Sequence, residues 1–267
     1  MKRHEFLRGL HRVTANRNYL EIGVNDGRSL RLSRVPSIAI DPAFKVATEL
    51  KCDVHLVKAT SDDFFARENP LAHLKGGRHP LRNLRRGRAP LGHWRRTVLD
   101  LSFIDGMHLF EYALRDFINV EKHSDWSSVI VFDDMLPRGV DEAARDRHTN
   151  AWTGDVYKIV EILARYRPDL VTVLVDTHPT GQLVVFGADP ASTVLKDRYD
   201  DIVAEFLVPD PQKVPESILD RVEAVQPERL LGASFWSRLS RARNIGLRRS
   251  RGWEPLRRAV QQLDAGR

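Results

Sequence analysis

Short apolar segments that end in an acidic residue constrain the fold of this chain more than any other feature. We interpret seven of them as strands, at residues 18–24, 37–40, 54–57, 97–104, 129–132, 170–175 and 183–186. Helical patterns alternate with these apolar segments. They predict a short helix that Ser61 or Asp62 would cap, and two longer helices at residues 111–120 and 154–166. Continuous apolar strands that alternate with helices favour a mainly parallel sheet covered on both faces.

The order of the elements predicts an α/β fold of the doubly wound, Rossmann-like type. The last two strands flank the turn Pro179-Thr180-Gly181, which predicts an antiparallel strand that closes the sheet. A length of 267 residues suits one large domain with an appendage. We expect the domain to cover residues 1–195, with a basic insertion at 68–96, and a helical basic extension to cover 196–267.

Positive charge is concentrated in the predicted insertion and extension. Residues 68–96 and 230–267 each carry a net charge of +7, whereas the whole chain carries +6. The rest of the chain is therefore acidic, and the basic character belongs to two peripheral segments. The insertion is either a plain surface loop or a docking arm for an anionic substrate. In the extension, Phe235, Trp236 and Leu239 near two arginines indicate an interfacial helix on an anionic membrane, or a packing or dimerisation helix.

The compartment follows from what the sequence lacks. Cys52 is the single cysteine, so the chain forms no internal disulfide and no cysteine-based zinc cluster. The first residues contain no apolar run typical of a signal peptide, and no segment approaches the ~20 apolar residues of a membrane-spanning helix. We expect a cytoplasmic protein, with peripheral membrane attachment as the alternative.

Acidic residues follow most of the predicted strands. They are Asp41, Asp62 or Asp63, Asp105, Asp133, Asp134 and Asp176. Aspartate favours turns in any protein, which accounts for each of them singly. In open α/β sheets, however, ligands bind outside the carboxyl ends of the strands, so the set as a whole indicates a binding edge.

A glycine loop follows the first predicted strand. The segment Glu21-Ile-Gly23-Val-Asn25-Asp26-Gly27 would let the backbone approach a ligand closely at its two glycines. It lacks the glycine register of the dinucleotide fingerprint and the lysine of a P-loop, which disfavours NAD and nucleoside triphosphates.

This loop resembles motif I of class I S-adenosylmethionine-dependent methyltransferases, an acidic residue followed by spaced glycines. The resemblance extends over roughly residues 18–187 and implies a cofactor site made of Glu21, Gly23, Asn25, Gly27, Asp41, Ser61, Asp62 and Asp105. Asp41 matches the acidic residue that accepts hydrogen bonds from the ribose hydroxyls. Ser61 and Asp62 match the loop beside the adenine.

The fourth and fifth strand ends resemble metal-dependent O-methyltransferases of the catechol and caffeoyl-CoA type. The resemblance implies Mg²⁺ ligation by Asp105, Asp133 and Asp134, with His108 at the position of the catalytic lysine. Aspartate stands in place of asparagine and histidine in place of lysine. Such a cation would ease deprotonation of a substrate hydroxyl. The alternative is that His108 acts as the base without metal, oriented by Asp105.

The segments FIDGMHLFEYALRDF, VIVFDDMLP and AWTGDVYK are similar to a group of bacterial sugar and natural-product tailoring methyltransferases. This implies methyl transfer to a hydroxyl of a small-molecule acceptor. Trp152 could form a platform for that acceptor or a packing contact at a helix start. A non-catalytic adenosine-binding or membrane-associated accessory protein remains the alternative. An Asp/Asn-Pro-Pro-Tyr motif is absent, so no specific nucleic-acid partner is predicted; a homodimer stays open.

Overall fold

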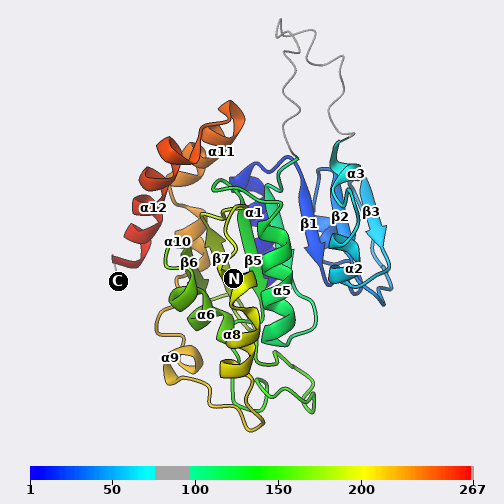
Figure 1. The fold of residues 1–267 in the computed structure, drawn as a ribbon, viewed down its shortest axis with the longest axis vertical. Helices are drawn as coiled ribbons and strands as arrows, with labels where there is room; N and C mark the ends of the chain where they lie inside the picture. The colour runs from blue at the N-terminus through cyan, green and yellow to red at the C-terminus, as the bar shows by residue number, and fades with distance from the viewer. Residues whose placement is uncertain (76–96, 266–267) are drawn as a thin grey trace, which may run out of the picture.

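A seven-stranded sheet forms the centre of the molecule. The computed structural model describes residues 1–75 and 97–265, and the strand order is β3-β2-β1-β4-β5-β7-β6 (Figure 1). The strands are β1 (Tyr19–Ile22), β2 (Ser37–Ile40), β3 (Val54–Val57), β4 (Leu101–Ile104), β5 (Val129–Asp133), β6 (Val171–Val175) and β7 (Gln182–Phe186). The first five are parallel, and β7 runs antiparallel to β5 and β6. The predicted doubly wound α/β fold with an antiparallel closing strand is confirmed.

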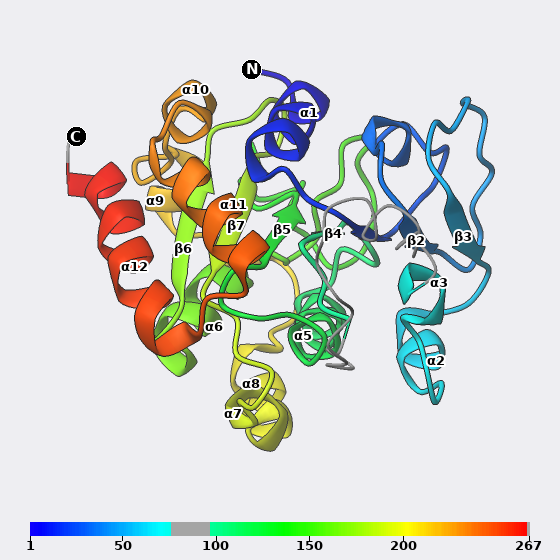
Figure 2. The same ribbon diagram turned by 90° about the horizontal axis from the view of Figure 1, so that it is seen from above.

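Helices cover both faces of the sheet (Figure 2). One face carries α2 (Ser61–Phe65), α3 (Ala72–Lys75), α5 (Phe110–Glu121), α6 (Lys158–Tyr166) and α8 (Tyr199–Phe206). The other carries α1 (Arg3–Thr14), α10 (Pro227–Leu231), α11 (Phe235–Ile245) and α12 (Arg249–Ala265). The short elements η1 (Leu30–Leu32), α7 (Val194–Asp197) and α9 (Glu216–Leu219) lie in the connections.

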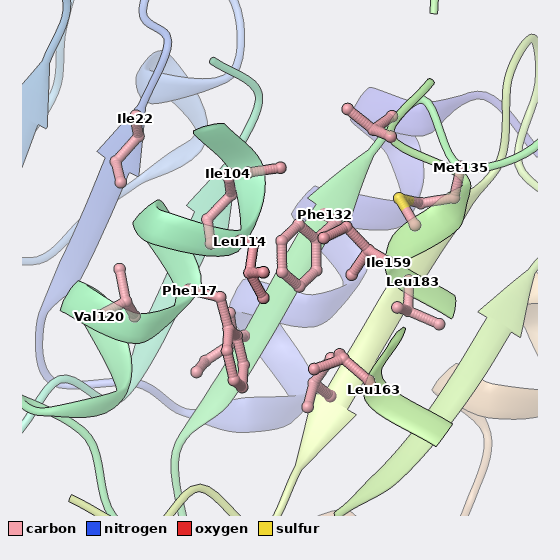
Figure 3. Close-up of a cluster of buried hydrophobic side chains, with 14 of the residues drawn as sticks. Ile22, Ile104, Leu114, Phe117, Val120, Phe132, Met135, Ile159, Leu163 and Leu183 are labelled. Carbon is pink, nitrogen blue, oxygen red and sulfur yellow. The ribbon is translucent and has the colours of Figure 1, made fainter. Parts of the chain in front are cut away.

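The alternation of side chains along the strands divides the core into two halves. Leu20 and Ile22 of β1 belong to the cluster under α5 and α6, whereas Tyr19 belongs to the cluster under α1. In the first cluster Phe117 stacks on Phe132, with ring centroids 5.8 Å apart (Figure 3). Every strand of the sheet centre is thus buried on both faces, which explains why the strands are continuous apolar runs.

Several predicted boundaries were wrong for local reasons. The strand expected from residue 97 begins at Leu101, because the N–H groups of Leu99 and Asp100 donate outside the sheet, to the carbonyl oxygen of His123 and to Oδ1 of Asn18. The helix expected from residue 154 begins at Lys158, after a turn in which Gly154 has a φ of +59°. Thr60 rather than Ser61 or Asp62 caps α2, accepting a hydrogen bond from the backbone of Asp63.

The segment after residue 195 is helical, as predicted, and packs on the sheet. Phe235, Trp236 and Leu239 are at most 3% exposed and lie against sheet residues such as Phe186. Of the two alternatives for these side chains, a membrane contact or a packing contact, the structure shows packing in the core. Arg243 of the same helix is also buried and donates to the carbonyl oxygens of Thr14 and Ser127.

The first residues of the predicted insertion, 68–96, include part of the core. Leu71 and Leu74 are buried in the core, so residues up to 75 belong to the fold. Residues 76–96 lie outside the described part of the chain. Within the described ranges, no helix is both long enough and apolar enough to cross a membrane.

Candidate functional site

The glycine loop lies where the direction of strand order reverses, between β1 and β4. Gly23 has a φ of +85°, and its N–H donates to the carbonyl oxygen of Ile40 at 2.9 Å. A Cβ atom at Gly23 would lie 1.7 Å from the carbonyl oxygen of Asp105, so only glycine fits. The loops after β1 and β4 therefore pack backbone against backbone, at the topological switch point where open α/β sheets bind ligands.

The carboxylate of Asp41 holds this loop from the end of β2. It accepts hydrogen bonds from the backbone N–H groups of Val24 and Asn25, both at 2.8 Å, and of Ala43 at 2.6 Å. Asn25 is itself in the left-handed region, with a φ of +48°. Gly27, with a φ of +81°, closes the loop beside Val46. The structure thus brings three of the predicted cofactor-site residues, Gly23, Asn25 and Asp41, together.

Glu21 lies beneath the loop instead of facing a ligand. It is fully buried, and its oxygens accept hydrogen bonds from the hydroxyls of Tyr19 and Ser29, both at 2.7 Å. Burial raises the pKa of Glu21 to about 7. Its predicted contact with the cofactor is replaced by a supporting role, because both oxygens are used inside the protein.

The predicted adenine-side residues face helix α5. The Ser61 hydroxyl donates to Asp116, and Asp62 contacts Asn119 at 3.1 Å and Arg115 at 3.3 Å. Asp62 is therefore engaged on the helix surface, whereas Ser61 lies at the site.

Sequence analysis missed Asp116, which is 4% exposed and lines the cavity at the end of β4. Burial raises its pKa to about 7. The sequence did carry a sign that Asp116 is buried. It is an acidic residue on the apolar face of α5, three positions after Ala113 and next to Phe117.

A small cavity of about 10 Å³ lies at the ends of β4 and β5. It is lined by Ile104, Asp105, Gly106, Met107, His108, Ala113, Asp116, Phe132, Asp133 and Val156. This space is about the size of one water molecule and far below the roughly 300–1,000 Å³ typical of ligand pockets.

The three carboxylates predicted to bind Mg²⁺ do not converge. The side chains of Asp105, His108 and Asp134 do converge. Each offers one donor atom, and these three atoms lie within 4.8 Å of one another. Asp133 instead accepts a hydrogen bond from the guanidinium of Arg3, the first residue of α1. The same guanidinium nitrogen lies 3.8 Å from Asp105.

His108 is held between two carboxylates. Its Nδ1 lies 3.0 Å from Asp134, and its Nε2 lies 3.6 Å from Asp105, beyond hydrogen-bond distance. Thr180 donates to the other oxygen of Asp134. Nδ1 therefore carries the proton that bonds Asp134, and in the neutral form of the imidazole the lone pair is on Nε2. The orienting residue is Asp134, whereas the sequence suggested Asp105.

Burial and mutual repulsion separate the pKa values of the three aspartates. Burial, together with the charges of its neighbours, raises the pKa of Asp105 well above its usual value. Burial and the charge of Asp134 raise the pKa of Asp133 to about 6. Burial opposes ionisation of Asp134, but the hydrogen bonds and charge of His108 outweigh it and lower that pKa. Asp134 is thus the carboxylate that stays ionised next to the imidazole.

Two residues at these strand ends have unusual backbone conformations. His108 and Asp134 have φ values of +56° and +61°. Such conformations cost free energy and concentrate at functional sites, where the surrounding structure enforces them. Here they turn both side chains toward each other.

Trp152 covers the imidazole. Its ring stacks on His108 with centroids 5.2 Å apart and planes at 22°, and its Nε1 donates to the carbonyl oxygen of Ala144. A Cβ atom at Gly154 would lie 1.7 Å from the carbonyl oxygen of His108, so this loop also packs on the site by its backbone. Trp152 forms one wall beside the candidate base.

Comparisons with known proteins concern the fold alone. No protein-family model matches the chain, and no curated protein sequence does. Solved structures are similar, among them the O-methyltransferase from Bacillus cereus in complex with S-adenosylhomocysteine. It is 16% identical and covers 69% of this chain and 80% of its own, with a TM-score of 0.39. The O-methyltransferase TomG from Streptomyces achromogenes, involved in tomaymycin synthesis, is 19% identical and covers 70% and 79%, with a TM-score of 0.39.

Proposed function

We propose that this protein transfers a methyl group from S-adenosylmethionine to a hydroxyl oxygen of a small molecule, such as a sugar-containing metabolite. The observation that carries the proposal is the contact of Gly23 with Asp105 at the switch point of the sheet. It places a backbone-only loop, the Asp41 carboxylate and a cavity with a histidine at one edge. No feature of this edge provides the phosphate-binding register of a dinucleotide or P-loop site.

The residues around the cavity divide into binding and chemical groups. Asp41 still has lone pairs for ribose hydroxyls, and Asp116 offers a carboxyl oxygen to an amino group. The cofactor supplies an electrophilic methyl group on a sulfonium. The task of the protein is therefore to hold the acceptor oxygen in line with that methyl group and to remove its proton.

His108 is suited to remove that proton. Asp134 fixes the imidazole with the proton on Nδ1, which leaves the Nε2 lone pair without a hydrogen-bond donor among the described residues. This is the arrangement of a general base with an orienting carboxylate. Trp152, stacked on the ring, prevents the imidazole from turning away.

Mg²⁺ is a poor match for these residues. The ion prefers oxygen ligands in octahedral geometry, whereas the donor atoms that converge here include an imidazole nitrogen. The third carboxylate, Asp133, is already bound to Arg3. The residues do not fit the predicted Mg²⁺ site, and no step of the proposed reaction uses a metal.

Calorimetry with S-adenosylhomocysteine tests the binding part of the proposal. We expect the wild-type protein to bind S-adenosylhomocysteine and not NAD. Asp41→Ala should weaken binding by roughly 1–3 kcal/mol, because the amides of Val24 and Asn25 lose their acceptor. Asp26→Ala is the matched control and should bind normally, because the Asp26 carboxylate, in the same loop, bonds only Arg28 within the described part of the chain.

Two outcomes would contradict this proposal. Equal affinity of the Asp41→Ala and wild-type proteins would remove Asp41 from the site. Binding of S-adenosylhomocysteine without methyl transfer to any of a panel of hydroxylated acceptors would instead support the accessory-protein alternative.

A further inference from the structure

Arg3 is held beside an acidic cluster, which consists of Asp105, Asp133 and Asp134. The contacts that hold it are made by the residues before and after Arg3 in the sequence. Lys2 forms a parallel bridge with His178, whose N–H donates to the carbonyl oxygen of Met1 at 2.9 Å. The N–H of Arg3 donates to the carbonyl oxygen of His178 at 3.0 Å. On the other side, Phe6 and later residues of α1 are buried against the sheet. The first residue of α1 is therefore fixed beside the ends of β4 and β5.

The guanidinium of Arg3 lies close to two of these carboxylates. It is hydrogen-bonded to Asp133, whose side chain is 1% exposed, and lies 3.8 Å from Asp105. The carboxylates Asp133, Asp105 and Asp134, in that order, raise the pKa of Arg3 against the effect of burial. The other oxygen of Asp133 is buried and has no hydrogen-bond partner in the described ranges. Without Arg3, the Asp133 carboxylate would have no hydrogen-bond donor there.

We propose that Arg3 is the resident cation of this cluster and takes the place that a divalent metal ion would otherwise occupy. Three carboxylates at adjacent strand ends need a compensating charge, because like charges in a buried site repel strongly. Arginine suits the role, since its guanidinium is always charged and is more weakly hydrated than an ammonium. A divalent ion near Asp105 and Asp133 would have to displace a guanidinium that the fold holds in place.

Titration with Mn²⁺, followed by the loss of its free electron paramagnetic resonance signal, tests this inference. We expect no stoichiometric binding to the wild-type protein at about millimolar Mn²⁺. Arg3→Met, which keeps the length of the side chain but removes its charge, should bind one Mn²⁺ at least about tenfold more tightly. Arg3→Lys, which keeps the charge, should resemble the wild type. Arg8→Met, an exposed arginine of the same helix, is the control and should not bind.

Either of two results overturns the inference. Tight Mn²⁺ binding by the wild-type protein would show that Arg3 does not occupy the cation position. A folded Arg3→Met variant that binds no more Mn²⁺ than the wild type would show that the cluster needs no cation.

A double substitution tests the inference if the single variant Arg3→Met fails to fold. If Arg3→Met unfolds the protein, Arg3→Met with Asp133→Asn removes both charges and should restore folding. Failure of that rescue would mean that Arg3 acts through something other than Asp133, and it would also overturn the proposal. These readouts do not require S-adenosylmethionine, so they remain valid if the proposed methyl transfer is wrong. If both proposals hold, methyl transfer will be unaffected by EDTA.

Discussion

At the scale of single residues, His108 is the side chain to which we assign proton removal in the proposed reaction. With an acceptor in hand, His108→Ala should lower kcat by about 10²–10⁴-fold, the usual range for loss of a general base. S-adenosylhomocysteine binding should be retained, because the imidazole contacts Asp134 and Trp152 and not the glycine loop. Steady-state kinetics and calorimetry on the same variant separate the two effects. His148→Ala, an exposed histidine of the same region, is the control, and an active His108→Ala enzyme would reduce that residue to a structural role.

Glu21 predicts a pH dependence of stability. Its pKa is about 7 in the folded protein against an ordinary value of 4.5, so the folded state keeps a proton that the unfolded chain releases. The free energy of unfolding therefore falls as the pH rises through this interval, by up to roughly 3 kcal/mol from this group. Glu21→Gln has no such titration and should become more stable relative to the wild type between pH 5 and pH 8.

Urea denaturation at the two pH values measures this difference. The exposed Glu49→Gln substitution is the control and should leave the pH dependence unchanged. A wild-type and a Glu21→Gln protein whose stability difference is the same at both pH values would show that Glu21 is ionised in the folded state.

At the scale of elements, a network of charged residues holds the loop between β5 and α6 over the site. Asp155 is fully buried and accepts hydrogen bonds from the backbone of Phe110, from Arg145 at 2.7 Å and from Lys158 at 2.8 Å. Arg145 also pairs with Glu111 at the start of α5. These contacts connect the loop that carries Trp152 to two helices.

Loss of Arg145 should therefore loosen this loop. Arg145→Met leaves Asp155 with one charged partner fewer, and we expect a loss of roughly 1–3 kcal/mol in the free energy of unfolding. Limited proteolysis should cut the loop faster, and kcat should fall because Trp152 no longer holds the imidazole. Arg138→Met, which breaks only the exposed pair with Glu142 in the same loop, should change stability by about 0.5 kcal/mol or less. Equal proteolysis of the two variants would contradict the role given to Arg145.

The elements were predictable where local pattern decides them. Continuous apolar runs identified the strands, and the aspartates after β4 and β5 indicated that this edge of the sheet is a site. Which side chains pair with one another at that edge was not predictable, because these pairs depend on contacts between segments that are distant in the sequence. Arg3 meets Asp133 only through the docking of α1, and Trp152 meets His108 only through the network around Asp155. The orienting role of Asp134 also depends on a backbone conformation that an apolar pattern does not encode.

At the scale of the whole molecule, the C-terminal helices complete one half of the core. Among the residues they bury are Trp236, Leu239, Trp253 and Val260, on the face of the sheet that α1 also covers. This changes the interpretation of the basic extension, because the aromatic side chains Phe235, Trp236 and Trp253 are buried inside the protein. Attachment to an anionic surface, which we retain as a proposal, would rest on exposed arginines such as Arg238 and Arg241.

A chain that ends at residue 230 should therefore fail to fold cooperatively. The truncation exposes sheet residues such as Phe186, which contacts both Phe235 and Trp236. In the full-length protein, Trp236→Ala should cost roughly 3–5 kcal/mol, the range for truncating a buried aromatic side chain. It also removes the indole N–H that donates to the carbonyl oxygen of Leu230 at 2.7 Å. Urea denaturation followed by circular dichroism measures both effects, with the exposed Arg238→Ala as the control. A truncated chain that unfolds cooperatively at the wild-type midpoint would show that the extension is an independent appendage and that residues 1–230 carry a sufficient core.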